Sequence, residues 1–264
     1  MYSFNYQKPA TLDDALKAIA AAEDGKFLAG GQTLIPTMKQ RLAQPSDIID
    51  ISGISDLSGI RRDGDNIVVG AMTRHAEVAA SDGVKSAIPA LAALAEAIGD
   101  PQVRNRGTLG GSIANADPAA DYPAAIVGLG ATVTTNTRSI PGDDFFTDLF
   151  ETALEENELV TSVSFPVPDK AAYAKFENPA SRYAIVGIMV SSGSAGVRVA
   201  VTGAGPKVFR VEAMEKALSD SFTPQAVAGI RVPADGLNAD IHASAEYRAH
   251  LVTVMAKRAV AAAA

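Results

Sequence analysis

The sequence predicts a protein of mixed helices and strands that is divided into subdomains. Its 264 residues are close to the length at which a single hydrophobic core usually splits. Segments with apolar residues at helical spacing alternate with short runs that are rich in β-branched residues. The character of the chain changes near Gly53 and again near Lys170, so we expect three units, at residues 1–52, 53–169 and 170–264.

The first unit is expected to be a small β-α-β-like arrangement. Thr11 can cap a helix, with Asp14 at the capping-box position, and Gly25 marks the end of that helix. A strand at Lys26–Ala29 leads into a glycine turn and a second helix, and Asp47–Ile51 forms another short strand.

The second unit is expected to open with a β-hairpin and to continue with helices. Ile60–Arg62 and Ile67–Val69 flank an Asp-Gly turn, Thr73 can cap a short helix, and Val84–Ile98 has apolar residues at helical spacing. Further along we expect a buried helix at Pro123–Leu129, strands at Ala131–Thr137 and Leu159–Phe165, and core positions for Phe145, Phe146, Leu149 and Phe150.

The third unit is expected to combine an antiparallel sheet with C-terminal helices. The strands are expected at Tyr173–Glu177, Ile185–Val190 and Val197–Val201, the helices at Val211–Leu218, Pro224–Ile230 and from Ser244 to Arg258, with Ala259–Ala264 as a fraying end.

Two glycine-rich segments are the candidate functional regions. Arg104–Asp121 shows neither helical nor strand periodicity, so we expect a long functional loop there. Ala29–Leu34 follows a short strand and precedes a helix, an arrangement that can hold a phosphate. Backbone amides of Ala29–Leu34 and of Gly110–Ser112 could face a pyrophosphate from two sides. Neither segment is a Rossmann fingerprint or a Walker A loop, and each alone also fits an ordinary surface loop.

Composition excludes several classes of function. The formal charge is −7 without a basic tract, which argues against nucleic acid as the main partner. The chain has no cysteine, so it offers no thiolate nucleophile and no ligand for an iron–sulfur cluster. His75, His242 and His250 match no metal motif, so we expect no metal site. No apolar run is long enough to span a membrane and no signal pattern is seen, so we expect a cytoplasmic protein.

Taken together, the two glycine-rich segments resemble the motifs of one particular protein family. The stretches AGGQTLIPTMKQRLAQPSDIIDI and RNRGTLGGSIANADPAADYPAA resemble the two flavin-binding motifs of the FAD-carrying medium subunits of molybdenum hydroxylases, the carbon monoxide dehydrogenase and xanthine dehydrogenase family. The resemblance continues through Lys175–Val186 to Ser244–Leu251. The segment Pro179–Tyr183 lacks the doubled arginine and aspartate of xanthine dehydrogenases, so the chain is most similar to the carbon monoxide dehydrogenase branch.

The resemblance implies a fold, a cofactor and a set of binding residues. The fold is α+β, of the vanillyl-alcohol oxidase type, with two N-terminal FAD-binding subdomains and a C-terminal α/β subdomain. The cofactor is FAD, and the resemblance implies no catalytic side chain in this chain. The implied binding residues are Lys26, Phe27, Leu28, Ala29, Gly30, Gly31, Gln32, Thr33 and Leu34 on one side, Thr108, Gly110, Gly111, Ser112, Asn115 and Asp121 on the other, and Ile98, Val160, Lys175 and Tyr183 near the flavin ring or the adenosine portion.

Two of these binding residues, and two arginines of the second glycine-rich segment, keep alternative interpretations. Lys175 is either a positive charge near the flavin or a solvated lysine on a strand. Tyr183 either covers one face of the ring or belongs to the core. Arg104 and Arg106 either pair with a phosphate, or bind Asp117 or a partner subunit.

Three functions follow from these observations. In the first, the chain takes electrons from a small iron–sulfur subunit and passes them to an external acceptor, which is quinone, NAD or oxygen. The substrate is oxidised at a molybdenum cofactor in a third, large subunit, which is the source of these electrons. In the second, the chain is a self-sufficient FAD-dependent oxidoreductase of the same fold. In the third, it is a nucleotide-binding scaffold without redox activity.

Overall fold

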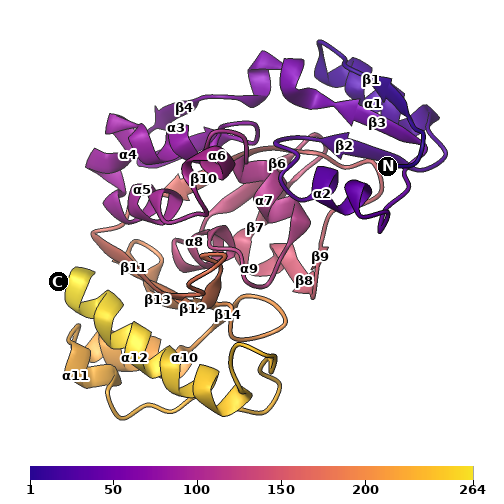
Figure 1. Ribbon diagram of the computed structural model, residues 1–264. Helices are drawn as coiled ribbons and strands as arrows, with labels where there is room; N and C mark the ends of the chain where they lie inside the picture. Colours follow the sequence, from indigo (N-terminus) through magenta and orange to yellow (C-terminus); the bar gives the residue numbers. More distant parts are fainter. Residues whose placement is uncertain (264) are drawn as a thin grey trace.

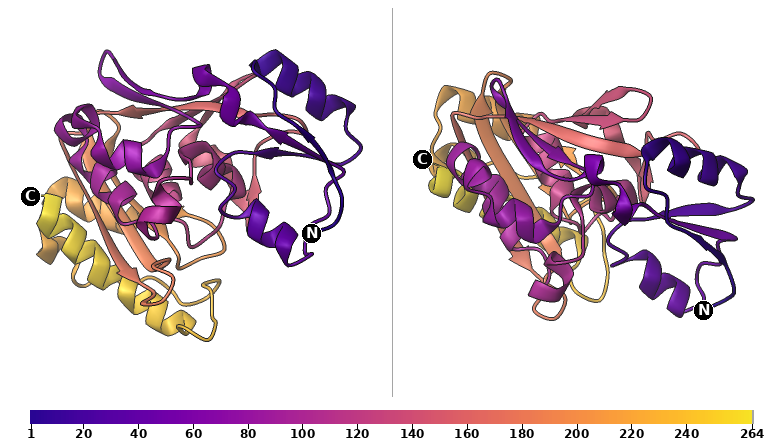
Figure 2. Two further views of the ribbon diagram at one scale, coloured as in Figure 1. Left: turned by 45° about the horizontal axis from the view of Figure 1, so that its top comes forward. Right: turned by 90° about the horizontal axis from the view of Figure 1, so that it is seen from above.

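Residues 1–263, which the computed structural model describes, form three main sheets and one small hairpin. The N-terminal sheet and the long C-terminal helix lie at opposite ends of the molecule, with the second sheet and its helices between them (Figure 1). Both turned views keep this order (Figure 2). The mixture of helices and sheets confirms the predicted α+β class.

The first sheet is parallel and has the strand order β1-β3-β2. The hydroxyl of Thr11 accepts a hydrogen bond from the amide of Asp14 at 3.2 Å, which confirms Thr11 as the helix cap. Ala15 and Ile19 of the helix pack on Ile49 of the central strand. The elements are β1 (Asn5–Gln7), α1 (Leu12–Ala21), β2 (Gly25–Leu28), α2 (Leu34–Lys39), β3 (Asp47–Asp50), η1 (Ile51–Gly53) and η2 (Ser55–Leu57).

The second sheet is antiparallel and has the strand order β4-β5-β10-β6-β7. The predicted hairpin is confirmed, with Ile60 paired to Val69. Val163 at the centre pairs with Val69 on one side and Val133 on the other, and it is fully buried. The strands are β4 (Ile60–Asp63), β5 (Asn66–Gly70), β6 (Thr132–Thr135), β7 (Ser139–Pro141) and β10 (Val160–Pro166).

The sequence predicts a single helix over residues 84–98, but the structure has two shorter helices there. The structure has α4 (Asp82–Ala87) and α5 (Pro89–Glu96), with Ile88 at φ −138° and ψ 70° between them. Pro89 has no amide hydrogen, and its ring disfavours helical geometry for the residue before it. Leu91 and Leu94 still reach the core, because each short helix keeps the helical spacing.

Thr73 is not the helix cap that the sequence predicts. Its hydroxyl instead bonds both the amide and the carbonyl of Gly59, at 2.9 and 3.0 Å, and is therefore already used. The cap of α3 (His75–Ala80) is Arg74, whose amide donates to the carboxylate of Glu77 at 2.8 Å.

The predicted loop Arg104–Asp121 contains a helix. After the short α6 (Pro101–Arg104), the hydroxyl of Thr108 accepts from the amide of Gly111 and begins α7 (Leu109–Asn115). Leu109 and Ile113 are both fully buried on one face. The high glycine content hid this helix, but the glycines let it lie against the neighbouring strand: a Cβ on Gly110 would come within 2.5 Å of the Ala71 Cβ.

Aromatic residues 145–150 divide between the core and the surface. Phe145 and Phe146 are buried as predicted, whereas Leu149 and Phe150 are 52% and 58% exposed, so the prediction of core positions for those two is wrong. They occupy the turn of a hairpin, and Phe150 has a φ of 54°. The segment is made of α9 (Gly142–Phe145), β8 (Phe146–Asp148) and β9 (Glu151–Thr152).

The third sheet is antiparallel, has the order β11-β12-β13-β14, and is covered on both faces. Ile188 and Val190 pack in the core with the C-terminal helix, whereas Met189 belongs to the core of the middle region. A Cβ on Gly128 would lie 2.6 Å from the Met189 side chain, so this glycine allows a close approach. The elements are α8 (Tyr122–Gly128), β11 (Lys170–Glu177), β12 (Ala184–Gly193), β13 (Gly196–Thr202), β14 (Phe209–Arg210), α10 (Glu212–Asp220), α11 (Pro224–Val227) and α12 (Ala245–Ala263).

The C-terminal helix is longer and better packed than predicted. The hydroxyl of Ser244 accepts from the amide of Tyr247 at 3.2 Å, which agrees with the predicted start. The predicted fraying end is wrong for its first residues, because Ala259 and Val260 are fully buried against the third sheet. Ala264 lies outside the described residues. Within residues 1–263 no helix is both long enough and apolar enough to cross a membrane.

Candidate functional site

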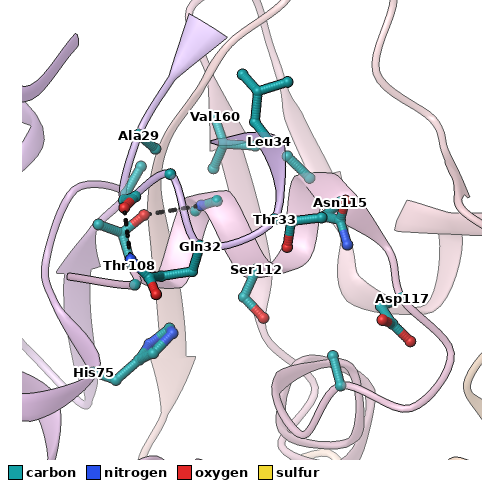
Figure 3. A pocket seen from close by; sticks show the side chains of 18 of the residues that line it. Ala29, Gln32, Thr33, Leu34, His75, Thr108, Ser112, Asn115, Asp117 and Val160 are labelled. Carbon is teal, nitrogen blue, oxygen red and sulfur yellow. Dashed lines mark hydrogen bonds between the residues drawn. The ribbon is translucent and has the colours of Figure 1, made fainter. Parts of the chain in front are cut away.

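A cavity of about 630 Å³ lies where the two glycine-rich segments meet. Its walls come from the turn after β2, from α7 and from the start of β10 (Figure 3), and also from the turn before β12. Of the residues proposed from the sequence, those that line the cavity are Lys26, Phe27, Ala29, Gly30, Gly31, Gln32, Thr33, Leu34, Ile98, Thr108, Gly110, Gly111, Ser112, Asn115, Asp121, Val160 and Tyr183.

The two glycine-rich segments touch each other directly. A Cβ on Gly30 would lie 2.2 Å from the carbonyl oxygen of Arg106 and 2.7 Å from the Cα of Gly107. A Cβ on Gly111 would lie 3.3 Å from the Cβ of Ala29. Gly31 has a φ of +72°, which L side chains rarely adopt. The glycines are thus needed for both close approach and turn geometry.

Unpaired donors of the first segment border the cavity. In the part of the chain that the structure describes, the amides of Gly30–Leu34 donate to no other protein group. The Thr33 hydroxyl has no protein partner among the described residues. Backbone amides and a hydroxyl of this kind are the donors that phosphate oxygens require.

The second segment differs from the prediction that its amides face a pyrophosphate. The amide of Gly110 donates to Ala71, and those of Gly111 and Ser112 donate to the side chain and carbonyl of Thr108. These bonds follow from the helix that the sequence did not reveal. The Ser112 hydroxyl and the Asn115 amide group remain without protein partners among residues 1–263, and both face the cavity in Figure 3. This wall therefore presents polar side chains to a ligand, rather than backbone amides.

Lys175 does not line the cavity but lies behind it. Its ammonium donates to the carbonyls of Ala97 and Arg182, at 2.8 and 2.7 Å, and lies 3.0 Å from Asp121. The Lys175 side chain is only 5% exposed, so its interpretation as a solvated lysine is wrong. Tyr173 also donates to Asp121, at 2.5 Å. Burial raises the pKa of the Asp121 carboxyl, and Lys175 and Tyr173 act in the opposite direction.

Tyr183 is at the mouth of the cavity and is not a core residue. It is 46% exposed, so its interpretation as a core tyrosine is wrong. It ends a turn in which the amide of Asn178 donates to the Tyr183 carbonyl at 2.8 Å and Arg182 has a φ of 62°. Together with Ser181 and Asp117, Tyr183 also borders a second cavity of about 420 Å³.

Three other residues considered from the sequence, Leu28, Arg104 and Arg106, do not line the cavity. Leu28 lies in β2 outside the lining of the cavity. Arg104 donates to the carbonyls of Ile98 and Gly99 at 3.0 and 3.1 Å, so its guanidinium holds the end of α5 in place. Arg106 is exposed, and in residues 1–263 neither arginine contacts Asp117. Burial raises the pKa of Asp117.

Several lining residues were not predicted as site residues from the sequence, and one of them is a buried imidazole. His75 borders the cavity, is 4% exposed, and its amide donates to the carbonyl of Gly107 at 3.0 Å. Burial, and then the charge of Arg104, lower the pKa of His75 to about 4. No sequence motif could have found it, because its position next to Gly107 arises only when the two segments come together.

Comparison with known proteins identifies the family. Residues 2–168 match the family described as "FAD binding domain in molybdopterin dehydrogenase". The nicotine 6-hydroxylase medium subunit of Paenarthrobacter nicotinovorans and the carbon monoxide dehydrogenase medium chain of Hydrogenophaga pseudoflava are each 36% identical, over 98% of this chain and 96% of theirs.

Solved structures agree with this match. A structure of carbon monoxide dehydrogenase from Hydrogenophaga pseudoflava superposes with a TM-score of 0.90 at 36% identity, and covers 99% of this chain and 97% of that chain. Quinoline 2-oxidoreductase from Pseudomonas putida 86 also gives a TM-score of 0.90, at 28% identity and with the same coverage. The chain therefore belongs to the family of FAD-binding domains of molybdopterin dehydrogenases, which are oxidoreductases, and its cofactor is FAD.

Proposed function

We propose that this chain is the FAD-carrying electron-transfer subunit of a molybdenum-containing hydroxylase or dehydrogenase of the carbon monoxide dehydrogenase type. The observation that carries the proposal is the cavity between the two glycine-rich segments, whose first wall presents free amides and whose second wall presents free side chains. Two relatives with similarity over nearly the whole chain are called a medium subunit and a medium chain, which supports the proposal.

The residues present fit FAD. The free amides of Gly30–Leu34, with Thr33, Ser112 and Asn115, would hold the pyrophosphate and the ribityl hydroxyls, which require donors. The apolar side chains of Ile98 and Val160 would pack on the ring systems and exclude water. When bound, FAD supplies the redox chemistry, accepting and releasing electrons one or two at a time.

In this scheme Lys175 would affect the flavin electrostatically through Asp121, without touching it. The carboxylate lines the cavity and its charge is balanced by the buried ammonium behind it. Tyr183 would lie against the ring at the open side of the cavity, since it is half-exposed there. The chain's own residues thus bind and orient the cofactor, and none is assigned a catalytic role.

The fold and the division of the chain belong to the same proposal. We assign the vanillyl-alcohol oxidase type of FAD-binding fold, with FAD-binding subdomains at residues 1–52 and 53–169 and a C-terminal subdomain at 170–264. The three main sheets lie within these three ranges, which supports the division. The cores are nevertheless continuous, because Met189 and Ala200 of the third sheet belong to the middle core.

The partners follow from the chemistry that this sequence does not carry. It has no cysteine, so the clusters that would deliver electrons require a separate iron–sulfur subunit. The molybdenum cofactor would be in a large subunit, and electrons would leave to quinone, NAD or oxygen. We place the complex in the cytoplasm.

The test is to load the purified chain with FAD and to measure its reduction with and without partners. Dithionite should bleach the flavin of the isolated chain, whereas carbon monoxide, purines or aldehydes should not do so in stopped-flow mixing. Addition of the iron–sulfur and large subunits should restore reduction by the substrate of the complex. Rapid bleaching of the isolated chain by a substrate would contradict the proposal and favour a self-sufficient flavoenzyme, and failure to bind FAD would favour a scaffold.

A further inference from the structure

The wall of the cavity contains a buried imidazole that forms no hydrogen bond with the described part of the chain. His75 is the first residue of α3, is 4% exposed and borders the cavity that Ser112 also borders (Figure 3). Among the described residues, no side-chain hydrogen bond of His75 is formed, and its Nδ1 is buried without a partner. A buried polar atom without a partner is costly, and in a native protein it calls for a ligand or another function.

The ring that packs against His75 carries a second buried polar atom without a partner. The Tyr122 hydroxyl is fully buried and also lacks a partner among residues 1–263. The His75 and Tyr122 rings contact each other, with centroids 5.3 Å apart and an interplanar angle of 47°. Both atoms lack a hydrogen-bond partner, so the Tyr122 hydroxyl does not satisfy Nδ1, and the two side chains meet only through ring packing.

The other nitrogen of the ring is the one available to a ligand. Nδ1 has no accessible surface, whereas Nε2 lies beside Gly107, where a Cβ would come within 2.6 Å of it. Gly107 begins the segment that continues into Thr108 and α7. Nε2 is therefore held at the junction of the two glycine-rich segments, and any larger residue at position 107 would displace it.

We propose that His75 binds FAD by donating a hydrogen bond from Nε2 to an oxygen of the cofactor, with the buried Nδ1 left unprotonated. The inference rests on the proposed function, because it needs FAD in this cavity. A proton on Nδ1 would be a buried donor without an acceptor, so the neutral ring carries its proton on Nε2, which fixes the tautomer. Flavin carbonyls, ribityl hydroxyls and phosphate oxygens are all acceptors of the required kind.

The environment makes His75 a donor without charge. Its pKa of about 4 leaves the imidazole neutral at physiological pH. The titratable side chains around it support this state: Arg104 contributes a repulsive positive charge, and Tyr122 has its pKa raised well beyond the physiological range, so it stays protonated. A neutral N–H is able to orient an oxygen of the cofactor without adding to the charge of the site.

Nuclear magnetic resonance of histidine nitrogens tests the proposal directly. The chain has only three histidines, so ¹⁵N-histidine labelling gives a simple spectrum of the full chain. With FAD added, the His75 signals should show the neutral form protonated at Nε2, with a shift of Nε2 that is absent without FAD. A ring protonated at Nδ1 in the FAD-loaded chain, or signals that do not respond to FAD, would overturn the proposal.

Three variants give an independent readout of affinity. H75Q keeps an N–H donor near the Nε2 position, so it should bind FAD within about threefold of wild type, whereas H75L should weaken binding by about tenfold or more. Y122F removes only a buried hydroxyl that has no partner, so its affinity for FAD and its tautomer signal should stay close to those of wild type. H250Q is the matched control, because His250 is exposed on α12, and its affinity should equal that of wild type.

The outcomes separate this inference from the proposed function. Wild-type protein that fails to bind FAD would contradict the proposed function itself. Wild-type protein that binds FAD while H75L binds it equally well would contradict only the role of His75. If H75L fails to fold, as judged by circular dichroism, the tautomer in the wild-type spectrum still decides.

Discussion

Lys175 and Asp121 form an ion pair that is buried behind the FAD cavity, with 3.0 Å between Nζ and Oδ1 and side chains only 5% and 4% exposed. The same ammonium donates to the carbonyl of Ala97 at the end of α5 and to that of Arg182 in the turn that carries Tyr183. One side chain therefore connects three segments that surround the site. Because all three of its protons are used, Lys175 has no donor left for the cofactor.

Replacing Lys175 by Met should destabilise the protein strongly. Removal of one member of a buried ion pair leaves the other charge uncompensated, which costs about 3–5 kcal/mol. We expect that loss in the free energy of unfolding measured with urea, together with faster release of FAD. The double variant K175M/D121N should recover part of the stability, because the carboxylate is then absent.

The control for this experiment is K216M, since Lys216 is exposed on α10 and makes no ion pair within the described residues. Its unfolding free energy should match that of wild type. Equal stability of K175M and K216M would show that the buried pair does not hold these segments together.

The glycines at the junction should tolerate no larger side chain. In G31V the branched residue would need a φ near +72°, and in G111V the new Cβ would lie 2.9 Å from the Thr108 hydroxyl and 3.3 Å from the Ala29 Cβ. We expect both variants to lose FAD on gel filtration. G229A is the control, because nothing lies within 4 Å of its Cβ position. Stoichiometric FAD in both valine variants would contradict the assignment of these turns.

The free hydroxyls of the cavity should each contribute modestly to affinity. T33A and S112A each remove one donor that has no protein partner, and a hydrogen bond of this type contributes about 0.5–1.5 kcal/mol. We therefore expect FAD to bind about two- to tenfold more weakly in each variant, measured by flavin fluorescence. S86A is the control, because Ser86 lies outside the cavity lining and bonds only to Gly83. Wild-type affinity in both cavity variants would place the pyrophosphate elsewhere.

Glu158 should make the protein sensitive to acid. Arg138 holds it with two hydrogen bonds, at 3.0 and 2.9 Å, and with help from Thr135 and Thr137 it keeps the pKa of the Glu158 carboxyl far below its usual range. A lowered pKa in the folded state means that this stabilisation is present above the ordinary glutamate pKa, about 4.3, and is lost as the pH falls below it.

The measurement is the melting temperature of wild type and of E158Q between pH 3 and pH 7. The difference between them should be largest near pH 7 and should shrink below about pH 4.3, because the unfolded chain then binds a proton at this carboxyl whereas the folded wild type keeps it ionised. A difference that stays constant over this range would show that the stabilisation provided by Glu158 does not depend on its charge.

The sequence by itself determined most strands and helices and the FAD family, and it proposed residues of which many line the cavity. Runs of β-branched residues reveal strands such as β5 and β6, and Thr11 and Ser244 reveal helix starts, because these signals act between residues that are close in the chain. The glycine-rich motifs resemble those of the family, and the family match agreed with them.

Only the tertiary structure decided how those residues act. Glycine content concealed α7, because its stability comes from Leu109 and Ile113 buried against distant strands rather than from local propensity. That helix uses the amides of Gly110–Ser112 and leaves Ser112 and Asn115 to face the cavity. The places of Lys175 behind Asp121, and of His75 beside Gly107, depend on contacts between residues far apart in sequence, which local patterns do not encode.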